Sequence, residues 1–140
     1  MDLDFKKMNG LVPAIIQDAS TAKVLMLGFM NEEAYKKTVE TGKVTFFSRT
    51  KNRLWTKGET SGNYLEVQAI HTDCDNDAVL ILAKPAGPVC HTGQETCFGN
   101  DVQLGNNNFL FRLEEIIKNR KSIKSEGSYT SKLFTEGLNR

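Results

Sequence analysis

The chain has 140 residues, of which 39% are hydrophobic and 25% charged, the profile of one globular domain with a buried core. Its net charge of +1 provides no field of one sign, so we expect neither nucleic acid nor a membrane surface as a partner. Because no apolar run approaches the roughly 18 residues of a membrane helix and the charged N-terminus lacks a signal-peptide pattern, we expect a cytoplasmic protein.

Strand patterns dominate the first part of the chain. Alternating, β-branched or continuously apolar segments predict strands, the first two forming a hairpin, at 11–18, 23–30, 43–48, 53–56, 64–71 and 78–83. A helix is predicted at Glu32–Glu40, because Asn31 is a favoured N-cap and Gly42 a favoured stop.

The remainder of the chain is organised differently. Prolines and repeated glycines predict a long loop at 85–105. Apolar residues at helical spacing predict helices at 109–118 and 129–138, with a polar break between them. The chain has three cysteines, and an odd number in a protein without an export signal favours metal or thiol chemistry over disulfides.

An acidic segment lies between the last two predicted strands. If it is extended, Asp73, Asp75 and Asp77 point to one face and Cys74 to the other. Three neighbouring carboxylates repel one another unless a cation lies between them, and Mg²⁺ is a natural partner for oxygen ligands. An EF-hand loop is excluded, because the required glycine and glutamate are missing. A solvated acidic turn is the alternative.

The other two cysteines lie in a polar, turn-forming segment. Cys90 and Cys97, together with Cys74, offer three thiolates, which suit a zinc ion that keeps one position open for water. His91 either closes that site as a fourth ligand or stays free as an acid or base, and the spacing leaves both roles open. Buried cysteines that act only as small apolar residues are less favoured, because the neighbouring residues are polar.

Four motifs together resemble phosphoribosyl-AMP cyclohydrolase of histidine biosynthesis. They are GFMNEEA at 28–34, FSRTKNRLWTKGETSGN at 47–63, DCDND at 73–77 and PVCHTG at 88–93. The resemblance implies an α+β fold in which a β-dominated cyclohydrolase domain covers residues 1–105. It also implies an obligate homodimer with active sites shared between the subunits.

The resemblance also implies the site residues and the reaction. Its zinc ligands match Cys74, Cys90 and Cys97, contributed by both subunits, and its magnesium ligands match Asp73, Asp75 and Asp77. The reaction is the third step of the pathway, in which water adds at C6 of N1-(5-phosphoribosyl)-AMP and the N1–C6 bond breaks. Zinc would lower the pKa of its bound water to about 7, and His91 is the expected acid or base.

The substrate carries two phosphate groups, and a basic loop offers residues to bind them. Arginine forks and lysines suit phosphate oxygens, hydroxyl groups can donate hydrogen bonds, and an aromatic ring can stack on the purine. The expected substrate-binding residues are Arg49, Lys51, Arg53, Trp55, Lys57, Thr60 and Ser61. The alternative is a solvated basic loop with the tryptophan in the core.

The end of the chain resembles the opening of phosphoribosyl-ATP pyrophosphohydrolase, an all-helical enzyme. We therefore expect residues 106–140 to form a linker and the incomplete start of that domain, as a helical tail. The chain would then be a shortened piece of a bifunctional protein, without pyrophosphohydrolase activity. Two other functions stay open: a zinc-dependent nucleoside or nucleotide deaminase, which releases ammonia, and a non-catalytic binding module stapled by zinc.

Overall fold

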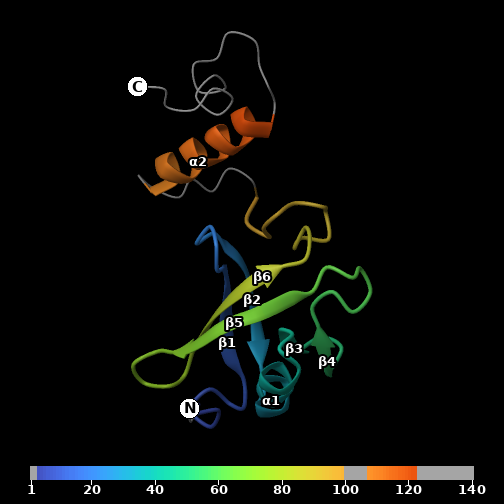
Figure 1. Ribbon diagram of the computed structural model, residues 1–140. Helices are drawn as coiled ribbons and strands as arrows, with labels where there is room; N and C mark the ends of the chain where they lie inside the picture. The colour runs from blue at the N-terminus through green and yellow to red at the C-terminus, as the bar shows by residue number, and fades with distance from the viewer. Residues whose placement is uncertain (1–2, 100–106, 123–140) are drawn as a thin grey trace, which may run out of the picture. The chain divides into compact units, whose positions relative to one another are not determined.

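The computed structural model describes residues 3–99 and 107–122 (Figure 1). The chain divides into two units, Met1–Val102 and Gln103–Arg140, and each is described by itself. The described residues contain six strands and two helices, so the predicted α+β class with a dominant sheet is confirmed. No helix among them has the length and apolar character needed to span a membrane.

A four-stranded sheet forms the centre of the first unit, in the order β2-β1-β6-β5 (Figure 1). The predicted hairpin is confirmed, because β1 (Val12–Asp18) pairs antiparallel with β2 (Val24–Met30). β6 (Val79–Pro85) lies parallel to β1, and β5 (Leu65–Thr72) lies antiparallel to β6. The direct connection from β5 to β6 is the acidic segment, which therefore lies at one end of the sheet.

Helix α1 (Glu32–Thr41) begins where its sequence predicts and ends one residue later than predicted, directly before Gly42. The side chain of Asn31 accepts a hydrogen bond from the backbone N–H of Ala34 at 2.8 Å, which satisfies one of the free donors of the first turn. Gly42 takes a left-handed conformation with φ of 66°, which glycine adopts at little cost. The helix is thus defined by local signals at both ends.

Strands β3 (Thr45–Ser48) and β4 (Arg53–Thr56) pair antiparallel in a small separate sheet. β3 begins two residues later than predicted, because Val44 donates its backbone N–H to Leu65 of β5 at 3.0 Å. This bond holds the segment that precedes the small sheet at the start of β5. The basic loop therefore has a fixed position relative to the main sheet.

The core lies between these elements and reaches the basic loop through aromatic rings. Phe46 is buried and packs on Trp55 with the ring centroids 5.7 Å apart. Phe46 also lies directly over Gly28 of β2, where any Cβ would overlap its ring. Gly28 therefore permits the contact that sets the position of Trp55.

In the second unit the structure describes helix α2 (Asn107–Ser122), which contains the helix predicted at 109–118. Leu110, Leu113 and Ile116 on this helix are exposed. The helix predicted at 129–138 and the predicted domain boundary at residues 105 and 106 lie outside the described residues.

Candidate active site

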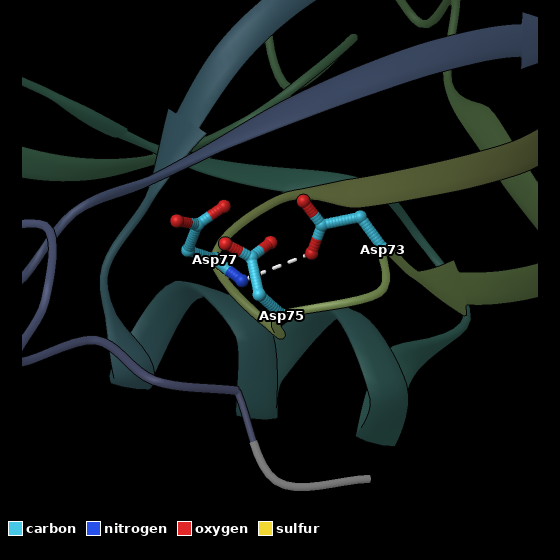
Figure 2. A group of neighbouring side chains, drawn as sticks. All are labelled: Asp73, Asp75 and Asp77. Atoms are coloured by element: carbon cyan, nitrogen blue, oxygen red, sulfur yellow. Dashed lines mark hydrogen bonds between the residues drawn. The ribbon is translucent and has the colours of Figure 1, made fainter.

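The acidic segment between β5 and β6 forms a turn rather than an extended strand, so the condition for the alternation of its side chains is not met. Asn76 has a φ of 61°, and Asp73 accepts hydrogen bonds from the backbone N–H groups of Asp77 at 3.0 Å and Ala78 at 3.1 Å. The turn still gathers the carboxylates of Asp73, Asp75 and Asp77 on one side (Figure 2). One oxygen from each lies within 4.8 Å of the others, so the three could hold a cation.

Lys7 contacts this cluster and was not identified from the sequence. Its ammonium group contacts Asp75 and lies 2.6 Å from Oδ2 of Asp77. Its hydrogen bonds to these carboxylates raise the pKa of Lys7, and its contact with Asp75 lowers the pKa of that carboxyl. The same N-terminal segment is attached to the turn by the backbone N–H of Asp4, which donates to Asn76 at 2.7 Å. The cluster thus accepts a cation in its present geometry.

The thiol loop, residues 90–97, is folded by its own backbone and anchored to the main sheet. The backbone N–H of Cys90 donates to Gln94, and Gly93, with a φ of 85°, donates back to Cys90, both at 3.0 Å. The backbone N–H of Cys97 donates to Leu25 of β2 at 2.8 Å. The loop therefore returns on itself and brings its first and last residues together.

The two thiols of this loop differ in their ionisation. The hydroxyl of Thr92 donates to Sγ of Cys90 at 3.1 Å and lowers the pKa of that thiol. Burial raises the pKa of Cys97, and the neighbouring Cys90 raises it further. Because zinc takes thiolate ligands, the pair could hold this metal, with Cys90 the more readily deprotonated. Nδ1 of His91 lies 3.8 Å from Sγ of Cys90, which leaves the choice between ligand and acid or base open.

A cavity of about 380 Å³ joins the thiol loop to the basic loop. The residues that line it come from both loops and from the turns beside them: Trp55, Lys57, Gly58, Thr60, Ser61, Asn63, Pro88, Cys90, His91 and Gly93. Gly58 has a φ of 89°, and any Cβ there would lie 2.5 Å from the backbone of Asn63 and Tyr64. The close return of the chain at Gly58 thus brings four predicted substrate residues beside Cys90 and His91.

A second, smaller cavity of about 230 Å³ is lined by Ser48, Lys51, Arg53 and Trp55. Trp55 lines both cavities. Arg49 is placed differently, with its guanidinium 4.0 Å from the ring centroid of Phe29. Neither cavity has Arg49 in its lining, so the structure separates Arg49 from the other predicted substrate residues.

Cys74 lies in the acidic turn, exposed to solvent. Across residues 3–99 and 107–122, the one group of three or more Cys, His, Asp or Glu ligand atoms within 4.8 Å is that of Asp73, Asp75 and Asp77. A single chain therefore does not bring Cys74 together with Cys90 and Cys97 at metal-binding distance.

The chain is similar to known proteins along its whole length. Residues 26–99 match the family described as phosphoribosyl-AMP cyclohydrolase. The "Histidine biosynthesis bifunctional protein HisIE" of Bacteroides thetaiotaomicron is 65% identical over 142 residues, which cover 100% of this chain and 68% of that protein. The protein of the same name from Escherichia coli K12 is 55% identical, with 99% of this chain and 68% of that protein covered. Its counterpart in Buchnera aphidicola is 56% identical, with 100% and 64% covered.

Proposed function

The chain belongs to the phosphoribosyl-AMP cyclohydrolase family, and from this premise we propose that it opens the adenine ring of N1-(5-phosphoribosyl)-AMP in the cavity beside Cys90. The cyclohydrolase activity is part of histidine biosynthesis, in which we place it as the third step. The observation that carries the proposal is the cavity itself, whose lining includes Cys90 and His91 together with Trp55 and Lys57. This cavity thus contains a metal ligand, a group that can transfer protons, an aromatic ring and a cation.

The reaction requires a nucleophile at C6 and a proton for the leaving nitrogen. Zinc, when bound by the thiolates, supplies the nucleophile by lowering the pKa of its water to about 7. Trp55 stacks on the purine, and Lys57 offsets the negative charge of the substrate. The water oxygen bonds to C6, and the N1–C6 bond breaks as a carbonyl group forms at C6. His91 takes one of the protons that the water loses and transfers it to N1. The amino group on C6 stays in the product, so no ammonia is released.

The proposed site also includes a magnesium ion and a residue from a second subunit. Asp73, Asp75 and Asp77 bind Mg²⁺, supported by the cluster of their oxygens and by its contact with the Lys7 ammonium. Cys74 completes the zinc site from a second subunit. The proposal of a homodimer is supported by the separation of Cys74 from the other two thiols within one chain.

The variant Cys90→Ser tests the proposed zinc site. We expect zinc content to fall below half of the wild-type value and ring opening to become undetectable, because serine is a poor zinc ligand. Zinc is measured by elemental analysis, and turnover by the absorbance change on ring opening. Cys90→Ser protein with normal zinc and full activity would contradict the assignment.

Two further measurements separate the proposal from its alternatives. Ammonia is assayed in the same reaction, because a deaminase releases one equivalent and ring opening releases none. Circular dichroism after chelation then tests for a structural zinc. If zinc removal abolishes turnover while the fold persists, the zinc is catalytic. If the chain unfolds, the zinc site is structural.

A further inference from the structure

Glu59 lines neither cavity, but it is linked to residues of both. Its backbone belongs to the same turn as Lys57, Thr60 and Ser61, which line the larger cavity. Its carboxylate contacts Arg53, which lines the smaller cavity. Glu59 therefore connects the residues of one cavity with those of the other.

The carboxylate makes two different contacts with its two oxygens. Oε1 accepts from Nη2 of Arg53 at 2.7 Å, and Oε2 accepts from the backbone N–H of Thr56, the last residue of β4, at 3.2 Å. The backbone N–H of Glu59 donates back to the carbonyl of Thr56 at 3.0 Å. The contact with Arg53 lowers the pKa of Glu59, so the side chain is ionised at neutral pH.

Arg53 is held by these contacts but keeps free donors. Nη2 donates to Glu59, and Nη1 donates to the carbonyl of Leu54 at 2.8 Å. A guanidinium has five N–H donors, so three are left for a ligand as far as contacts within residues 3–99 and 107–122 are concerned. Lys51 lines the same small cavity, and the negative charge of Glu59 offsets the repulsion between these two cations.

We propose that Glu59 is a positioning residue, which holds Arg53 ready to bind one phosphate of the substrate in the smaller cavity. The inference rests on the proposed function, because that substrate has a phosphate at each end. One phosphoribosyl end lies in the smaller cavity with Lys51 and Arg53, and the reacting ring lies in the larger cavity with Cys90, with Trp55 in the lining of both. Glu59 touches no part of the substrate and acts through Arg53.

The variant Glu59→Gln keeps the size of the side chain and an acceptor for Thr56 but removes the charge. We expect KM to rise about fivefold with kcat nearly unchanged, because a weakened ion pair of this kind affects ground-state and transition-state binding equally. The matched control is Glu40→Gln on α1, an exposed residue with the same change of charge, for which we expect wild-type KM. An unchanged KM in Glu59→Gln would overturn the proposal.

A double-mutant cycle separates positioning from a purely structural role. Arg53→Gln alone raises KM, and Glu59→Gln added to it should produce no further rise if Glu59 acts through Arg53. Fully additive effects, or a wild-type KM in Arg53→Gln, would overturn the proposal. Glu59→Asp restores the carboxylate and should recover part of the loss. If the proposed function itself is wrong, the wild-type protein will not open the ring. That result is distinguishable from a failure of the Glu59 proposal, in which the wild-type protein is active.

Discussion

Lys7 contacts carboxylates that lie 68 and 70 positions later in the chain, at Asp75 and Asp77. The sequence indicates that three neighbouring carboxylates need a cation, and the clustering of their oxygens follows that prediction. It does not indicate that a lysine meets the cluster, because no local pattern links residues so far apart. At the thiol loop, the residue types predict zinc chemistry, but the hydroxyl that lowers the pKa of Cys90 belongs to Thr92, which only the folded loop brings into contact.

The variant Lys7→Met tests the cluster as a cation site. We expect its affinity for Mg²⁺ to rise about fivefold, because the ammonium repels the incoming ion and competes for the same oxygens. The dissociation constant is measured by titration calorimetry on metal-free protein, so the result does not depend on turnover.

The neighbouring Lys6 supplies the control for this experiment. Lys6→Met removes the same charge from an exposed position beside Lys7, and we expect a much smaller change in Mg²⁺ affinity. Equal dissociation constants for wild-type and Lys7→Met protein would show that the ammonium does not compete with the metal.

At the scale of the element, most boundaries follow from local chemistry. The caps at Asn31 and Gly42 define α1, and the hairpin of β1 and β2 is read from its strand and turn residues. The acidic segment is an exception, since alternating aspartates suggested an extended chain where the structure has a turn. An alternating pattern of residue types indicates a strand only where the backbone pairs with a neighbouring strand. Here the backbone N–H groups of Asp77 and Ala78 donate to the side chain of Asp73 instead.

The variant Gly28→Ala tests the contact between β2 and β3. The added methyl group would overlap the ring of Phe46, so we expect a loss of about 2 kcal/mol in the free energy of unfolding. Urea denaturation measures this loss. Because Phe46 packs on Trp55, we also expect a weaker substrate affinity.

A compensating change makes this test specific. In the double variant Gly28→Ala with Phe46→Leu, the smaller side chain leaves room for the methyl group, and the two losses should be less than additive. A Gly28→Ala protein with the wild-type urea midpoint would contradict a tight packing of the ring on the strand.

At the scale of the whole molecule, one chain assembles only part of the proposed site. Cys90 and Cys97 affect the pKa of each other, whereas Cys74 is not at metal-binding distance from the pair. The proposed zinc site therefore combines two thiols from one subunit with one from another.

Mixed dimers test this division. We expect chains with Cys74→Ser and chains with Cys97→Ser, each inactive alone, to recover about a quarter of wild-type activity when mixed in equal amounts. In the mixed dimer one site collects both substitutions and the other collects neither. Turnover is measured after unfolding and refolding the mixture.

The structure also supplies a matched control for the mixture. Cys90→Ser mixed with Cys97→Ser should recover nothing, because both thiols belong to the same half of the site and each mixed site retains one substitution. Recovery in this control, or no recovery with Cys74→Ser despite verified mixed dimers, would contradict the shared site.

Residue order alone was enough to predict the family motifs, most strands, the helix caps and the residue types of the proposed metal and substrate sites, because these depend on local chemistry. Which of these residues contact one another depends on the fold. It places Trp55 and Lys57 beside Cys90, places Arg49 over Phe29 and brings Lys7 to the aspartates. Such contacts depend on how the strands pair and how the core rings pack, and these are long-range interactions that residue order alone does not express.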